Sequence, residues 1–274
     1  MIRIFSFLAG LFMVGALAWS LLWSGLDFAS EGLPKSVERE FHKHPKELHL
    51  ASDGAFGHFD NQQLQRGFQV YQEVCAACHS LGQVAYRDLA DLGYNADEVK
   101  AIAAKASVPA YNKATGEVVS KPGLPTDKFP PVVYAAQGSP PDLSLITKAR
   151  HEGPAYVYSL ITGYQNQPAD LLKKYPDAKT GSGLHYNPYF ANLNIAMAPP
   201  LAEGQVTYGD GTKASVDQMA KDVSAFLVWT AEPKLAKRNQ TGWPVLGFVL
   251  FATILAWFAK KQVWAGAPSA RRKD

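Results

Sequence analysis

Two cysteines and a histidine within five consecutive residues are the feature of this chain with the clearest chemistry. Cys75 and Cys78 are the only cysteines in the 274 residues, and His79 follows them directly. This spacing is the attachment signature of a c-type haem, in which two thiols form thioethers with one porphyrin and the histidine reaches the iron. A structural zinc site would need further ligands of the same kind. The motif therefore predicts one covalent haem c and electron-transfer chemistry.

The segment ahead of the cysteines predicts the helix that must position them. Leu64, Phe68 and Tyr71 recur at helical spacing, and polar residues lie between them. A redox dithiol of the thioredoxin kind would instead follow a strand in a βαβ pattern. An amphipathic helix that closes at Cys75 is typical of small c-type cytochromes, so we favour haem attachment over a dithiol.

The second axial ligand of such a haem sets its potential, and the sequence offers several candidates. A methionine thioether raises the potential relative to bis-histidine ligation and closes the iron to external ligands. Two of the four methionines lie near the N-terminus, and Met219 lies on an apolar helix face, where core packing is the better interpretation. Met197 lies in a loop stiffened by two prolines, which suits a weakly binding sulfur. We favour Met197; His151 and His185 are the weaker, bis-histidine candidates.

Long loops and short helices are expected around these residues. A dense run of prolines and glycines over 109–141 predicts a long loop that packs over the haem. Asp142 is placed to cap a helix that ends near residue 149, and a second helix is expected over 154–162. Residues 165–190 are rich in Tyr, Asn, Pro and Gly and predict another loop.

The last helix of the outer domain is expected to begin after Ser215. Gln218, three residues on, completes a capping-box pattern. Apolar side chains recur at i, i+3, i+4 and i+7 between residues 216 and 230, which predicts a helix that packs on the haem-bearing helix. Pro233 should end it, and residues 232–242 should form a short basic linker.

The charges argue against nucleic-acid binding. The formal net charge is +3, and the surplus of Lys and Arg lies at the two ends of the chain, so the central body is close to neutral. A protein that binds nucleic acid would concentrate basic residues on one face of its folded domain.

The C-terminal region predicts a transmembrane helix over residues 241–264. Residues 243–259 carry no charged side chain, and Trp243, Trp257 and Trp264 are suited to positions at the membrane interface. The basic tail, 265–274, should stay in the cytoplasm, which places the c-type haem domain, 31–240, in the periplasm of a bacterium.

The N-terminal residues 1–30 are also apolar, behind a single arginine. Two interpretations stay open: a secretory signal peptide that is removed, or a retained membrane anchor. Either one delivers the central domain across the inner membrane, where c-type haem is attached.

Several segments, in one order along the chain, resemble the cytochrome c1 family, the haem subunit of the cytochrome bc1 complex. The matching segments are 67–71 (GFQVY), 75–80 (CAACHS), 140–144 (PPDLS), 149–151 (ARH), 156–164 (YVYSLITGY), 186–190 (YNPYF), 197–200 (MAPP) and 231–233 (AEP).

The resemblance implies a mainly α, c-type cytochrome fold with long proline-rich loop insertions, a C-terminal transmembrane helix and an apolar N-terminal helix. It implies that Cys75 and Cys78 form the thioethers and that His79 and Met197 ligate the iron. It also implies that two further side chains, Arg150 and Tyr156, contact a haem propionate, as a guanidinium and a phenol are suited to do.

The resemblance also implies the reaction partners. The haem would take electrons from a Rieske iron–sulfur protein and pass them to a soluble c-type cytochrome. Cytochrome b would lie beside the anchor in the membrane lipid, within a dimeric quinol–cytochrome-c reductase. Quinol chemistry would occur in cytochrome b, so no catalytic residue is expected here.

Two other functions remain as alternatives. A membrane-tethered c-type cytochrome that serves a terminal oxidase outside a bc1 complex would need a flexible linker before its anchor. A haem sensor or peroxidase would need an open iron position, which methionine ligation would close.

Overall fold

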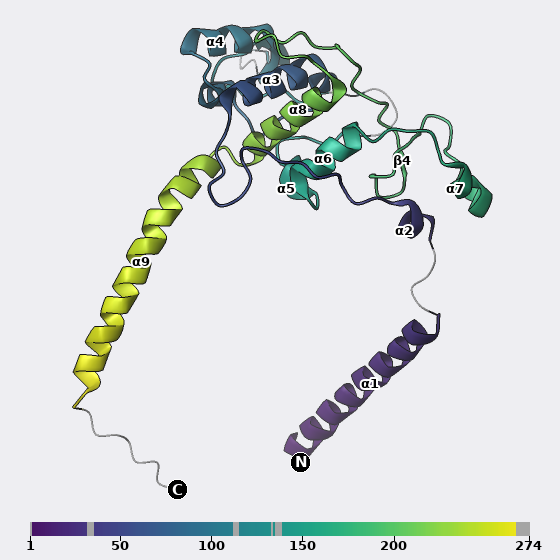
Figure 1. Ribbon diagram of the computed structural model, residues 1–274, viewed down its shortest axis with the longest axis vertical. Helices are drawn as coiled ribbons and strands as arrows, with labels where there is room; N and C mark the ends of the chain where they lie inside the picture. The colour runs from purple at the N-terminus through teal and green to yellow at the C-terminus, as the bar shows by residue number, and fades with distance from the viewer. Residues whose placement is uncertain (1, 32–35, 112–114, 133, 135–138, 267–274) are drawn as a thin grey trace.

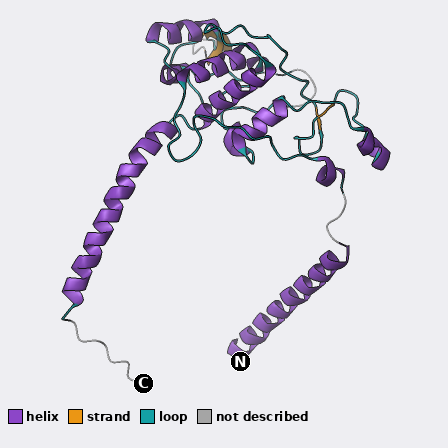
Figure 2. Ribbon diagram, viewed as in Figure 1, coloured by secondary structure: helices purple, strands orange, loops and turns teal. Residues whose placement is uncertain are grey.

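The computed structural model describes residues 2–31, 36–111, 115–132, 134 and 139–266 (Figure 1). It is mainly helical, with only short strand pairs in the described part, as expected (Figure 2). The helices are α1 (Ile2–Glu31), α2 (Val37–Phe41), α3 (Asn61–Glu73), α4 (Ala96–Lys105), α5 (Ile146–Ala149), α6 (Gly153–Ile161), α7 (Ala169–Lys174), α8 (Val216–Ala231) and α9 (Leu235–Trp264). Short 3-10 helices are η1 (Cys75–Ala77), η2 (Tyr86–Leu92) and η3 (Pro176–Ala178), and the strands are β1 (Ser107–Tyr111), β2 (Val118–Pro122), β3 (His185–Tyr186) and β4 (Asn194–Ile195).

The crossing of α3 and α8 forms the centre of the core (Figure 1). Phe68 and Tyr71 of α3 lie against Phe226 of α8, with ring centroids 5.6 and 5.8 Å apart. The Ser215 side chain caps α8 by accepting a hydrogen bond from the Gln218 amide at 3.1 Å, as predicted. Met219 is fully buried in this core, in agreement with its assignment to packing.

A buried ion pair fixes the same crossing. The Asp222 carboxylate on α8 has no exposed surface and accepts a hydrogen bond from Arg66 of α3 at 3.0 Å. Gln63 and Gln218 also donate to Asp222, so the Gln218 side chain does not complete the predicted capping box. Because a buried carboxylate without partners would be costly, these donors make the α3–α8 register specific.

The proline-rich stretch 109–141 is not the continuous loop that its composition predicts. Its first part contains strand β2 and most of β1, which pair in antiparallel register, with Pro109 opposite Ser120. Both strands of a two-stranded sheet are edge strands, where proline is tolerated, and this explains the error. Residues 112–114, 133 and 135–138 of the stretch lie outside the described part.

Two local predictions are also wrong. Asp142 does not cap the next helix, because α5 begins only at Ile146, after a cap residue, Leu145. The expected loop over 165–190 contains α7 and η3, which lie near a small second core of Leu171, Tyr186 and Leu193. Short helices of this kind are stabilised by such contacts more than by their own sequence.

Helices α1 and α9 are each long and apolar enough to cross a membrane, over 2–30 and 235–264. Their most apolar stretches are not buried against the rest of the protein. The expected linker over 232–242 is largely absent, because α9 already begins at Leu235, three residues after Glu232. Of the expected cytoplasmic tail, residues 267–274 lie outside the described part.

Candidate functional site: the haem attachment region

The end of α3 places the two cysteines in one tight turn. Helix α3 stops at Glu73, and Cys75 opens η1. The Cys75 carbonyl then accepts hydrogen bonds from the amides of Cys78 at 3.1 Å and His79 at 2.9 Å. Burial, reinforced by Cys78, raises the pKa of the Cys75 thiol to about 12. An attacking thiol of a redox dithiol would have a lowered pKa, so this environment argues against a dithiol of that kind.

The His79 side chain is oriented by a main-chain carbonyl. Its Nδ1 lies 2.8 Å from the Pro141 oxygen, and since a carbonyl only accepts, Nδ1 must carry the proton. The lone pair of Nε2 is then free to bind a metal, which is the usual arrangement of a ligating histidine. Tyr71 of α3 holds the same residue through its main chain, donating to the His79 carbonyl at 2.9 Å.

Asp142 holds the Pro141 segment against the turn. Its carboxylate accepts hydrogen bonds from the Ser80 hydroxyl at 2.8 Å, the Gly82 amide at 2.7 Å and the Ser144 amide at 2.8 Å. Burial alone would raise the pKa of Asp142, but the hydrogen bonds outweigh it and the pKa is lowered. An ionised carboxylate therefore fixes the carbonyl that orients His79.

Arg150 and Tyr156 are brought together by a sharp turn between α5 and α6. Glu152 has φ 60° and Gly153 has φ 46°, which reverses the chain within a few residues. Burial raises the pKa of the Tyr156 hydroxyl, and the Arg150 guanidinium opposes the rise through charge and a hydrogen bond. An exposed guanidinium beside a half-buried phenol is suited to a haem propionate.

Met197 lies in a braced segment that follows strand β4. Asn194 and Ile195 pair with Tyr186 and His185 of β3, and the half-buried Met197 comes two residues later. Of the other sequence candidates, Met219 is in the α3–α8 core, His151 is exposed, and His185 is half-buried in β3, where it pairs with Ile195.

Sequence reasoning gave no role to one residue near this segment. Tyr164, three residues after α6, donates a hydrogen bond from its hydroxyl to the Met197 carbonyl at 3.0 Å. Burial, with Tyr156 nearby, raises the pKa of this hydroxyl. Tyr164 lies within one of the segments that resemble the cytochrome c1 family, but nothing in its spacing points to Met197.

By residue type and local setting these residues suit a covalently attached haem: two cysteines in one turn, an imidazole with a free Nε2, a guanidinium–phenol pair and a half-buried thioether. When bound, a haem supplies one-electron chemistry. The attachment and orientation of the haem by these residues are part of the function proposed below.

Comparison with known proteins decides the family. The sequence model that describes the Cytochrome C1 family matches residues 50–267 of this chain. The chain belongs to the cytochrome c1 family. Members of this family carry covalently bound haem c and function in electron transport, and the described part of this chain has the helical fold and the attachment motif that such a role requires.

Relatives come from bacteria and from mitochondria. The chain is 42% identical over 228 residues to a cytochrome c1 of Rhodospirillum rubrum, covering 77% of this chain and 84% of the relative. It is 43% identical over 221 residues to a mitochondrial cytochrome c1 heme protein of Neurospora crassa, covering 78% and 65%. It is also 42% identical over 235 residues to a cytochrome b/c1 of Bradyrhizobium diazoefficiens, of which it covers only 34%.

Proposed function

We propose that this chain is the electron relay of a cytochrome bc1 complex. Its haem c takes electrons from a Rieske iron–sulfur protein and passes them to a soluble c-type cytochrome, so the chain acts as a subunit of quinol–cytochrome-c reductase. Cys75 and Cys78 hold the porphyrin, His79 and Met197 ligate the iron, and Arg150 with Tyr156 holds a propionate. The family membership and the geometry of these residues support the proposal.

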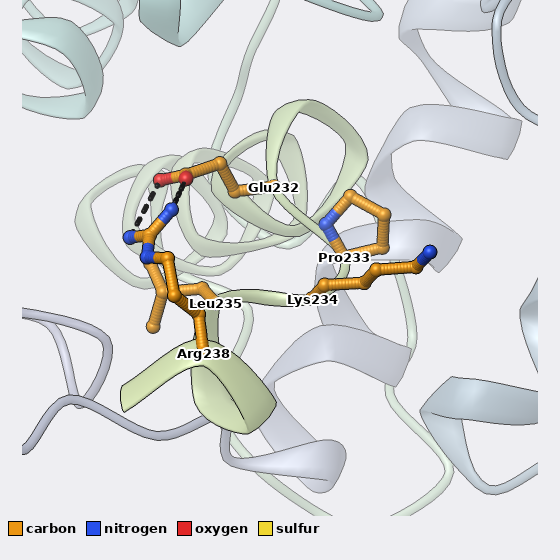
Figure 3. A pocket seen from close by; sticks show the side chains of 5 residues that line it. All are labelled: Glu232, Pro233, Lys234, Leu235 and Arg238. Atoms are coloured by element: carbon orange, nitrogen blue, oxygen red, sulfur yellow. Dashed lines mark hydrogen bonds and ion pairs between the residues drawn. The ribbon is translucent and has the colours of Figure 1, made fainter. Parts of the chain in front are cut away.

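The short, bonded junction between the haem domain and α9 favours a fixed relay over a tethered carrier. Glu232, at the end of α8, is paired with Arg238 of α9 (Figure 3). It is also paired with Lys148 of α5, at 3.0 Å. Leu235, the first residue of α9, is buried. Anchor, α8 and α5 therefore meet at one carboxylate, whose pKa the two cations lower.

The loop at residues 55–57, near the start of the haem domain in the sequence, also contacts this junction. Asn239 donates to the Gly57 carbonyl at 3.1 Å, and the Trp243 indole donates to the Ala55 carbonyl at 3.2 Å. Phe56 stacks on Trp243 with ring centroids 5.1 Å apart. A freely reaching carrier needs a flexible linker at this point, whereas here the first turns of the anchor are bonded to the domain.

The chain's own residues would determine the environment of the haem iron. They would form and break no bond during electron transfer. The Pro141 carbonyl accepts a hydrogen bond from Nδ1–H of His79 and so would orient Nε2 toward the iron of a bound haem, and a thioether ligand would favour the reduced iron. No proton has to move at either ligand when the iron changes its oxidation state.

The proposed setting is the inner membrane of a bacterium, with residues 31–240 in the periplasm and 265–274 in the cytoplasm. Cytochrome b is the proposed neighbour of α9 in the lipid, within a dimeric complex. The relative in Bradyrhizobium diazoefficiens that is named cytochrome b/c1 supports this association.

Purification in mild detergent, followed by identification of the co-purifying subunits, tests the proposal. Cytochrome b and a Rieske protein should co-purify with the haem-loaded chain. Recovery of a lone haem protein, or of a terminal oxidase with it, would favour the tethered carrier instead.

A matched pair of insertions tests the junction itself. A Gly-Gly-Ser insertion between Pro233 and Lys234 should separate α9 from Glu232 and slow haem reduction by quinol in the intact complex, with haem attachment unchanged. The same insertion beside exposed Gly209 serves as the control. Equal reduction rates in both variants would argue against a fixed relay.

A further inference from the structure

The Met197 segment is supported on one side and open on another. On the supported side, β4 pairs with β3, and the Asn187 amide donates to the carbonyl of Leu193, whose φ of 64° turns the chain into β4. The buried Asn187 side chain also donates to the Leu160 carbonyl near the end of α6 at 2.7 Å. The segment is thereby tied to α6.

On the open side lies a solvent-accessible pocket of about 580 Å³. Its lining includes Tyr164, His185 and Pro199, the last of which lies two residues after Met197. Side chains around a cavity lack the close packing that fixes a protein core. The segment reaches this pocket at Pro199, where packing restrains the chain less and a hydrogen bond can add restraint.

Tyr164 provides that restraint. Its hydroxyl donates to the Met197 carbonyl at 3.0 Å, and its ring packs edge-on against His185 of β3 with centroids 6.4 Å apart. The backbone that carries the ring is tightly packed. The preceding residue, Gly163, lies so close to the Tyr189 ring that a Cβ at position 163 would be 2.4 Å from it. Tyr164 thus joins the exit of α6 to the main chain of the proposed ligand.

We propose that Tyr164 is a positioning residue for the axial sulfur, which it holds over the iron through the Met197 carbonyl. The inference rests on the proposed ligation by Met197. Sulfur of a thioether is a weak iron ligand, so its bond depends on a backbone that is already in place. Loss of the hydroxyl should let the segment move toward the cavity and leave the iron position open part of the time.

Carbon monoxide binding to the reduced, haem-loaded full chain in detergent tests this inference. Tyr164→Phe removes the hydroxyl and keeps the ring, so the fold should persist. Because one hydrogen bond is lost, apparent affinity for carbon monoxide should rise about two- to tenfold, and the midpoint potential should fall. Tyr158→Phe is the matched control, since that hydroxyl bonds Asp217 of α8 and not the Met197 segment.

The outcomes separate this inference from the ligand assignment. Wild-type protein that resists carbon monoxide, with Met197→Leu open and Tyr164→Phe intermediate, supports both. If Met197→Leu opens the iron but Tyr164→Phe behaves as wild type, or as Tyr158→Phe does, the positioning role is wrong and the ligand stands. Ready binding by the wild type would overturn the ligand assignment.

Discussion

Gly67 of α3 lies directly against the main-chain carbonyl of Asp222 on α8. A Cβ at position 67 would lie 2.0 Å from that oxygen and 2.7 Å from the Cβ of Phe226. Only glycine permits this approach, and the approach sets how deeply the haem-bearing helix and the last helix of the domain interlock. The turn that carries Cys75 starts two residues beyond α3, so the crossing also places the attachment site.

Substitution of Gly67 should therefore destabilise the whole domain. Gly67→Val forces α3 and α8 apart, and we expect the free energy of unfolding to fall by about 3 kcal/mol or more, since overpacking a tight core is costly. Thermal or denaturant unfolding in detergent measures it. Gly209→Val is the control, because nothing lies within 4 Å of a Cβ there. Similar unfolding of the two variants would contradict the close approach.

Met197→Leu should leave the haem attached and lower its midpoint potential. The thioether favours the reduced iron, and leucine supplies no ligand, so we expect a fall on the order of 100 mV or more. Redox titration of the purified chain measures the change. Met219→Leu, in the buried core, should leave the potential near that of the wild type. If the midpoint potential fell only in the Met219→Leu variant, Met219 would be the iron ligand and Met197 would not.

Cys78→Ser should impair covalent attachment. A serine hydroxyl does not form the thioether, so one vinyl group of the porphyrin stays unsaturated. The pyridine haemochrome band should move from the position of a two-thioether haem, and less haem should resist acid–acetone extraction. Ala77→Ser, an exposed change within the same turn, should have neither effect. An unaltered band in the Cys78 variant would refute the attachment motif.

Asp142 should make stability depend on pH in the acid range. Hydrogen bonds lower the pKa of its carboxylate in the fold. Its stabilisation is thus fully present above the unfolded aspartate pKa of about 4 and is lost as pH falls through the lower folded value. Asp142→Ala should cost about 1 kcal/mol at neutral pH and flatten the acid limb of a plot of melting temperature against pH.

The control for that experiment is Asp91→Ala, at an exposed aspartate of η2. It should keep the acid limb of the wild type. If Asp142→Ala and the wild type lose stability in parallel down to pH 3, the Asp142 carboxylate does not hold the Pro141 segment by hydrogen bonds in solution.

Local patterns predicted the helices that carry long, regular periodicity. The spacing of Leu64, Phe68 and Tyr71 indicated α3, and the Ser215 cap with the stripe after it indicated α8 and its contact with α3. These signals are strong because each lies within one element and repeats over several turns. The attachment motif is likewise contiguous, so Cys75, Cys78 and His79 could be proposed from residue types alone.

Two of the features that the sequence did not reveal depend on contacts between residues far apart in the chain. Asp142 has the residue type of a helix cap, but its partners Ser80 and Gly82 come from the attachment turn, some 60 residues earlier. The bond from Tyr164 to Met197 joins residues 33 apart. The β1–β2 pair was hidden by its prolines, whose cost depends on whether a strand is central or at an edge.

The continuous α9 has a consequence for the lipid. A helix of 30 residues tilts to match its apolar length to the thickness of the bilayer. The first turns of α9 are bonded to the Ala55–Gly57 loop and to Glu232. We therefore expect a tilt of α9 to reorient the outer domain as well. If α9 spans the membrane, we expect bilayer thickness to influence the inclination of the turn that carries Cys75 and Cys78 relative to the lipid surface.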